Sequence, residues 1–138
     1  MNVKVRWIED MKMMAESGSG HSVIMDGPED LGGINIGFRP MEMVLIGMAG
    51  CSIIDIVSII KKMREVDTIC RAEVTAKRAE KEPKVFNEIN IKFKLEGANL
   101  NTNKVEKAIN LSIEKYCSAS IMFAKTAKIK HSFEIIND

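Results

Sequence analysis

Two cysteines are the residues whose types and positions could do chemistry. Cys51 lies within a nearly all-apolar stretch that runs from Arg39 to Asp55, and Cys117 lies much later, in Glu114-Lys-Tyr-Cys-Ser-Ala-Ser120. A thiolate is a strong nucleophile and is easily oxidised, so two thiols at the edges of helical patterns suggest redox or nucleophilic chemistry. Free cysteine is also among the most buried residue types. Cys51 therefore has a second interpretation as a core residue.

Charged residues near Cys51 would decide whether its thiol ionises. Asp55 follows it by one helical turn, while Glu42 and Arg39 lie near the start of the same stretch. Two carboxylates would oppose ionisation of the thiol, whereas a guanidinium would promote it. Asp55 also has a simple interpretation as a buried hydrogen-bonding residue, and Arg39 as a solvated residue beside the helix start.

The position of Cys117 leaves two alternatives open. At the end of a helix the dipole disfavours a thiolate, but at the start of a following helix, which Ser118-Ala-Ser120 would begin, the dipole favours one. Cys70 is expected to be a core residue of a strand, and His131 a core or interface residue. His21 is expected in a surface turn, and no CxxC pair or Cys/His set has zinc spacing, so no metal site is predicted.

The composition is that of a globular protein. The chain has 138 residues, 46% of them hydrophobic and 28% charged, and a formal net charge of +1. These values predict a single domain spanning residues 1–138 and give no reason to expect a nucleic-acid partner. Three cysteines without a visible secretion signal or regular spacing favour a cytoplasmic location.

The elements that must position the cysteines follow from hydrophobic periodicity. Alternating residues predict strands at 3–7, 11–15, 23–25, 70–77, 89–95 and 129–135, and helical spacing predicts helices at 40–64 and 105–116. The first three strands read as an antiparallel meander, and strands 70–77 and 89–95 as a long hairpin. Asn103 with Glu106 resembles a capping pair. The order βββ-α-ββ-α-β indicates an α+β fold with a mainly antiparallel sheet packed on a long central apolar helix.

The helix from Pro40 to about Arg64 is apolar on nearly every side. Proline is favourable at the first helical position, and the helix is expected to be the most enclosed element. A membrane helix is the alternative, but a carboxylate such as Asp55 at mid-bilayer costs roughly 2.5 kcal/mol or more, so no membrane is expected. Gly47, Ala49 and Gly50 form a thin side that would let a second copy of the helix approach, which suggests a dimer.

Together, these residues resemble a known family. Pro40-Met-Glu-Met-Val-Leu and Gly47-Met-Ala-Gly-Cys51-Ser-Ile-Ile-Asp55, followed by Glu114-Lys-Tyr-Cys117-Ser-Ala-Ser120, are similar to the OsmC/Ohr family of osmotically inducible and organic-hydroperoxide-resistance proteins. Residues 21–27 and 78–86 resemble its YhfA-like branch most. The similarity runs nearly end to end, which implies one OsmC-like domain over residues 1–138.

The resemblance implies a thiol-dependent peroxidase that works as an intertwined homodimer with sites at the subunit interface. By position, Cys51 corresponds to the peroxidatic cysteine, which attacks an organic or hydrogen peroxide and becomes a sulfenic acid. Cys117 corresponds to the resolving cysteine, which forms a disulfide with it, and a dithiol reductant restores both thiols. The resemblance implies no cofactor.

The chain departs from the organic-hydroperoxide branch near the thiol. That branch has an arginine in the N-terminal sheet region, but the turn from Ser17 to Gly20 contains none. Its glutamate position corresponds to Met41, and Glu42 is the next residue. Arg39 and Glu42 are therefore expected to replace these two groups by proximity. Two other functions stay open: a module that binds a small apolar or acyl ligand, and a thiol redox sensor with little turnover.

Overall fold

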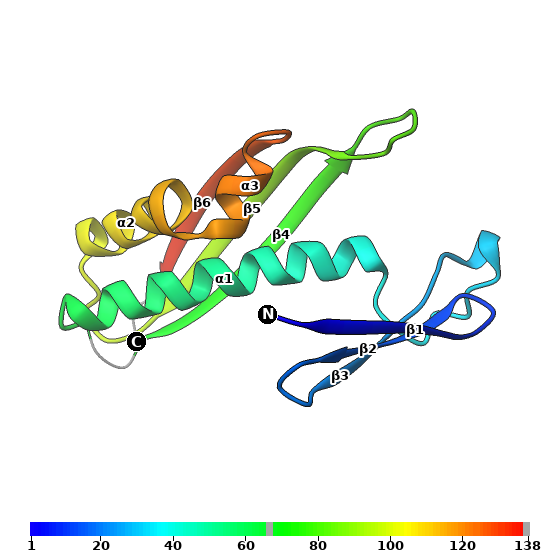
Figure 1. Ribbon diagram of the computed structural model, residues 1–138. Helices are drawn as coiled ribbons and strands as arrows, with labels where there is room; N and C mark the ends of the chain where they lie inside the picture. Colours follow the sequence, from blue (N-terminus) through cyan, green and yellow to red (C-terminus); the bar gives the residue numbers. More distant parts are fainter. Residues whose placement is uncertain (66–67, 137–138) are drawn as a thin grey trace. The chain divides into compact units, whose positions relative to one another are not determined.

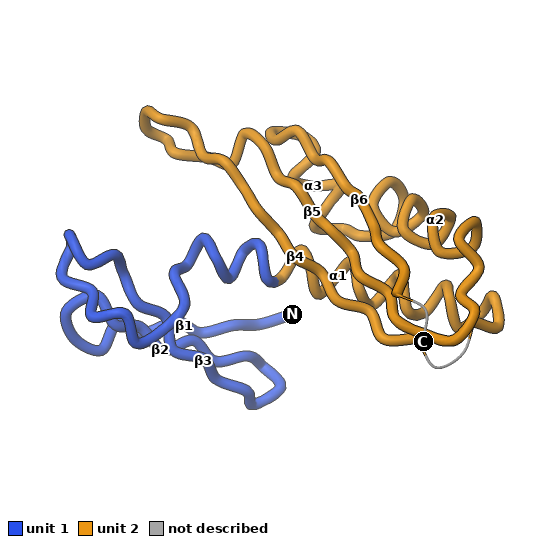
Figure 2. The backbone as a smooth tube through the Cα atoms, turned by 180° about the vertical axis from the view of Figure 1, so that it is seen from behind, with its two compact units in different colours: residues 1–46 blue, residues 47–138 orange. Residues whose placement is uncertain are grey.

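The computed structural model describes residues 1–65 and 68–136 and is shown in Figure 1. The chain forms two compact units, Met1–Ile46 and Gly47–Asp138, which Figure 2 colours separately. They are called unit 1 and unit 2, in chain order. The element order is βββ-α-ββ-α-β, with short helical turns added, so the predicted α+β class is confirmed.

Unit 1 contains the predicted antiparallel meander. Its strands are β1 (Val3–Glu9), β2 (Lys12–Ser17) and β3 (Ser22–Met25), in the order β1-β2-β3. Val5 pairs with Ala15, and Ala15 pairs with Val23. Asp10 has a positive φ of 47° in the turn between β1 and β2, a conformation that aspartate tolerates better than most residues.

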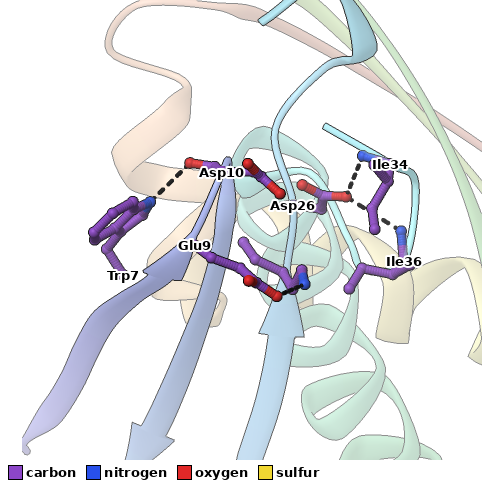
Figure 3. Close-up of polar contacts among 7 residues, drawn as sticks. Trp7, Glu9, Asp10, Asp26, Ile34 and Ile36 are labelled. Carbon is purple, nitrogen blue, oxygen red and sulfur yellow. Dashed lines mark hydrogen bonds and ion pairs between the residues drawn. The ribbon is translucent and has the colours of Figure 1, made fainter. Parts of the chain in front are cut away.

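The segment after β3 is organised around one buried carboxylate, as Figure 3 shows. Asp26 accepts hydrogen bonds from the backbone N–H groups of Gly27 at 2.8 Å, Ile34 at 2.9 Å and Ile36 at 3.3 Å. Burial opposes ionisation of this carboxyl, but the three N–H donors outweigh burial and lower its pKa. The chain between β3 and Phe38 therefore folds back around an ionised side chain, with a single turn of helix, η1 (Glu29–Leu31), at its tip.

Helix α1 (Pro40–Lys62) begins where proline predicted it, in unit 1, and continues through unit 2. Its buried residues form one stripe, Met48, Ser52, Ile56 and Ile60. Ile54, on another side, is 71% exposed. The prediction that this helix would be the most enclosed element is therefore wrong for a single chain, because only one stripe finds partners. By length and composition α1 could also cross a membrane, a test that core helices of soluble proteins pass as well.

The sheet of unit 2 has the order β4-β5-β6, formed by β4 (Ile69–Arg78), β5 (Phe86–Glu96) and β6 (Lys128–Ile136). The predicted hairpin of β4 and β5 is antiparallel, whereas β5 and β6 are parallel. The described residues thus form two three-stranded sheets, mainly antiparallel, with one parallel pair of strands. Alternate residues of β5 are buried, as the sequence pattern predicted: Ile89, Ile91, Phe93 and Leu95; Phe86, at the start of the strand, is buried as well.

The crossover from β5 to β6 consists of three helical pieces. They are α2 (Thr102–Leu111), the π-helical turn η2 (Ser112–Tyr116) and α3 (Ser118–Phe123), and α2 and α3 lie along one face of the sheet (Figures 1 and 2). The predicted capping pair of Asn103 and Glu106 is wrong. Asn101 caps α2 instead, its side-chain oxygen accepting the N–H of Lys104 at 3.1 Å.

Candidate active site

The fold brings Cys51 and Cys117 together in unit 2. Their Sγ atoms and a carboxylate oxygen of Asp55 all lie within 4.8 Å of one another. Both cysteines are free; Cys117 is fully buried and Cys51 half-buried. Helix α1 supplies Cys51 and Asp55 one turn apart, and the chain supplies Cys117 where η2 ends and α3 begins. Two thiols far apart in sequence thus share one site.

Cys117 is surrounded by hydrogen-bond donors. Its Sγ accepts the N–H of Ser120 at 3.4 Å and the hydroxyl of Ser120 at 3.1 Å, and it lies 3.2 Å from Ser52 Oγ. Cys117 is the N-cap of α3, since its side chain accepts from the first turn of that helix. Of the two alternatives left open by the sequence, the structure has the one in which Cys117 starts a new helix.

Buried serines join the crossover to α1 and hold the site in place. Ser112 Oγ donates to the backbone oxygen of Ser52 at 3.1 Å. Ser52 Oγ lies 3.1 Å from Met48 O as well as near Cys117 Sγ, so its single proton serves one acceptor at a time. Because each of these polar groups has a partner, they can be buried without a large penalty.

The two thiols have opposite tendencies to ionise. Burial raises the pKa of the Cys51 thiol, the N–H of Ala119 opposes this rise, and the nearby Cys117 and Asp55 add to it. Burial also opposes ionisation of Cys117, but the donors of Ser120 and Ser52, together with Cys51, lower the pKa of the Cys117 thiol. Within one chain, negative charge is therefore held better on Cys117 than on Cys51.

Asp55 has a carboxylate oxygen, Oδ2, that is buried and has no hydrogen-bond partner among the described residues. A buried acceptor without a donor is costly, so this atom is available to a ligand or a proton. The sequence left the role of Asp55 open between catalysis and structure, and the geometry adds it to the site.

Arg39 and Glu42 belong to unit 1 and make local contacts there. Glu42 is exposed, and its Oε2 accepts the backbone N–H of Arg39 at 2.8 Å, an arrangement that caps the start of α1. The guanidinium of Arg39 contacts Gly37 O at 3.5 Å. Their predicted part in catalysis stays a prediction.

The other reactive residues lie elsewhere. Cys70, on β4, is half-buried, and burial raises the pKa of its thiol to about 11, so it is a poor nucleophile. His131 Nε2 lies 2.9 Å from Asn110 Oδ1 and is half-buried, as expected for a core or interface residue. His21 is exposed at the end of the turn before β3, as predicted.

Sequence reasoning missed Ser52 and Ser120, the residues that hold Cys117. Two signals could have found them. Ser52 is a polar residue on the buried stripe of an apolar helix, and Ser120 is the third residue after Cys117, the position whose N–H an N-cap side chain receives. Polar residues at apolar positions next to a thiol are informative in such a helix.

Comparison with known proteins identifies the family. The family described as OsmC-like protein matches residues 31–132, a segment that contains both cysteines. Protein YhfA of Escherichia coli K12 is 40% identical over 139 residues, covering 99% of this chain and 98% of the relative. The chain belongs to the OsmC family. The predicted resemblance to its YhfA-like branch is thereby confirmed.

Solved structures of other proteins share the fold. A hypothetical protein from Aquifex aeolicus VF5 superposes with a TM-score of 0.87 at 28% identity, over 99% of this chain and 96% of that one. The organic hydroperoxide resistance protein OsmC from Legionella pneumophila gives 0.72 at 19% identity, over 96% and 95%. The fold is therefore that of the OsmC family along nearly the whole chain.

Proposed function

We propose that this OsmC-family protein reduces organic peroxides, and hydrogen peroxide in the same way, through Cys51 and Cys117. The observation that carries the proposal is the meeting of two free thiols within 4.8 Å in a partly buried site with donors around one of them. The Legionella pneumophila protein with the same fold is an organic hydroperoxide resistance protein, and this supports the class of substrate.

The first step uses the two sulfurs in different roles. The donors of Ser120 and Ser52 hold the negative charge on Cys117, while Cys51 is the more accessible of the pair. Cys117 accepts the proton of Cys51, and the Cys51 thiolate attacks the distal oxygen of the peroxide. The O–O bond breaks and Cys51 becomes a sulfenic acid. Cys117 gives the proton that it received from Cys51 to the departing alkoxide, which leaves as an alcohol.

The remaining steps return both cysteines to the thiol form. The Cys117 thiolate attacks the sulfur of the Cys51 sulfenic acid, forms a disulfide and displaces hydroxide, which is protonated to water. A dithiol reductant then attacks the disulfide, becomes a disulfide itself and returns both cysteines to the thiol form. Each turnover thus transfers two electrons from the dithiol to the peroxide.

The active form is proposed to be a homodimer in the cytoplasm. A single chain leaves large apolar side chains uncovered on β1 and on α1, among them Val5, Trp7, Ile46 and Ile54, which are 46% to 71% exposed. Apolar exposure on this scale indicates a surface that another protein covers. A second copy of the chain is the partner that the family resemblance implies.

Peroxide consumption with a dithiol reductant tests the function. Cumene hydroperoxide should be consumed by the wild-type protein and by Cys70→Ser, and not by Cys51→Ser. One equivalent of peroxide should join the peptides of Cys51 and Cys117 with the loss of two hydrogens, measured by mass spectrometry. Equal turnover by Cys51→Ser would refute the proposal, and a disulfide with negligible turnover would point to a redox sensor instead.

The donor network has its own test. Ser120→Ala removes a hydroxyl donor that stabilises the Cys117 thiolate, and one such bond contributes about 1 kcal/mol, so disulfide formation by Cys117 after peroxide addition should slow about fivefold. Ser118→Ala, at an exposed position two residues away, is the matched control and should keep the wild-type rate. An unchanged rate in Ser120→Ala would show that this donor does not assist the chemistry.

A further inference from the structure

Three atoms at the thiol pair have the identity and spacing of metal ligands. The Sγ atoms of Cys51 and Cys117 and a carboxylate oxygen of Asp55 lie mutually within 4.8 Å. In a tetrahedral zinc site with Zn–S bonds of about 2.3 Å, two sulfur ligands lie about 3.8 Å apart. Small side-chain rotations would therefore bring the three atoms onto one ion. Sequence spacing could not reveal this set, because its members come from α1 and from the distant start of α3.

The unpartnered oxygen of Asp55 is a second, independent observation. Asp55 contributes one carboxylate oxygen to the cluster with the two sulfurs, and its Oδ2 is buried and accepts no hydrogen bond among the described residues. A buried carboxylate oxygen without a donor is costly to keep, and a cation would satisfy it. Carboxylate oxygen combined with two thiolates is a ligand set that zinc accepts.

The surroundings of the sulfurs suit bound thiolates. Cys117 Sγ receives hydrogen bonds from the N–H and hydroxyl of Ser120, and it lies 3.2 Å from Ser52 Oγ. Two thiolates and a carboxylate carry three negative charges, one more than a divalent ion neutralises, so donors to sulfur offset the excess. Such outer contacts also fix the direction of the ligands.

From this geometry we infer that the reduced protein binds one zinc ion, or a similar thiophilic divalent cation, through Cys51, Asp55 and Cys117, with a fourth position open to water. Binding and disulfide formation exclude each other, because both use the same two thiolates. A bound ion would therefore protect the pair from oxidation, and oxidation would release the ion. The inference does not depend on peroxidase turnover.

Cobalt titration of the reduced full-length protein tests the site without measuring activity. One equivalent of Co²⁺ should give a sulfur-to-cobalt charge-transfer band and the visible bands of tetrahedral cobalt, and Zn²⁺ should remove both. Competition with a chromophoric chelator then measures zinc affinity. Asp55→Asn should weaken zinc binding about tenfold or more, and the Cys51–Cys117 disulfide form should not bind.

Cys70→Ser is the matched control, since it removes the third thiol without touching the site, and it should bind like the wild type. Circular dichroism of each variant checks that it is folded, and the disulfide form of the unmutated protein gives a result even if Cys51→Ser or Cys117→Ser fails to fold. Absence of saturable binding at one equivalent, or unchanged affinity in Asp55→Asn, would overturn the inference.

Discussion

Unit 1 and unit 2 are each stabilised internally in a different way. Among the described residues, every apolar side chain that is buried belongs to unit 2, with Phe93, Ile89 and Ile109 fully enclosed. Unit 1 has one fully buried polar side chain, Asp26, while Trp7 on β1 is 69% exposed. Unit 2 therefore has the core that an independent fold needs, and unit 1 relies on backbone pairing and one carboxylate.

The difference shows which part of the chain can hold the residues of a site in a fixed geometry. Both cysteines, Asp55 and the serines that hold Cys117 belong to unit 2, so the proposed site is built on the better packed part of the chain. Catalytic groups need support from packed neighbours to keep their geometry. Unit 1, with its uncovered apolar strand, has the character of a surface that is completed by association.

The largest effect should come from breaking the core of unit 2. Phe93→Ala removes a fully buried ring, and such truncations cost about 3–5 kcal/mol of unfolding free energy. Chemical denaturation should show this loss. Asn87→Ala, at an exposed position on the same strand, should change the unfolding free energy by about 0.5 kcal/mol or less. A small loss of unfolding free energy in Phe93→Ala would mean that packing around Phe93 contributes little to the stability of unit 2.

A smaller effect should come from the exposed strand of unit 1. If a second copy covers β1, Trp7→Ala should weaken dimerisation by about 2 kcal/mol, the size expected when a central interface tryptophan is truncated. Sedimentation at several protein concentrations measures it. Arg6→Ala, the neighbour on the other face of the strand, is the control. Wild-type protein that sediments as a monomer at all concentrations would contradict the proposed dimer.

The smallest effect should come from acid at Asp26. Its folded-state pKa is lowered, so the stabilisation is present above the ordinary carboxyl pKa and is lost as the pH falls through the folded value. NMR shifts of the Ile34 and Ile36 amides should follow this titration, and Asp26→Asn should abolish it. Asp30→Asn, exposed in the same loop, should leave it in place. If the amide shifts did not change with pH, ionisation of Asp26 would not be what holds this loop.

Local patterns predicted most of the elements because their causes are local. Alternation placed β4 and β5, since the buried face of a strand repeats every second residue. Proline marked the start of α1. The cap of α2 failed because two asparagines compete, and Asn101 wins where Leu100 and Val105, both buried, occupy the positions of a hydrophobic staple.

The candidate site was only partly predictable because its members meet through tertiary structure. The cysteines could be named from the resemblance, but their approach depends on how the crossover packs on α1. The lone oxygen of Asp55 and the donors of Ser52 and Ser120 become visible only when both segments are in place. The parallel pairing of β5 and β6 likewise depends on the crossover rather than on either strand.

The π-helical turn η2 gives the crossover a phase shift. In this turn the N–H of Cys117 bonds to the oxygen of Ser112, five residues back, at 2.8 Å, so the segment holds one residue more than an α-helical turn would. One residue of an α-helix corresponds to a rotation of about 100°. Removing a residue here would swing the second sulfur around the helix axis. The distance between the two sulfurs thus depends on the number of residues in this segment as much as on its side chains.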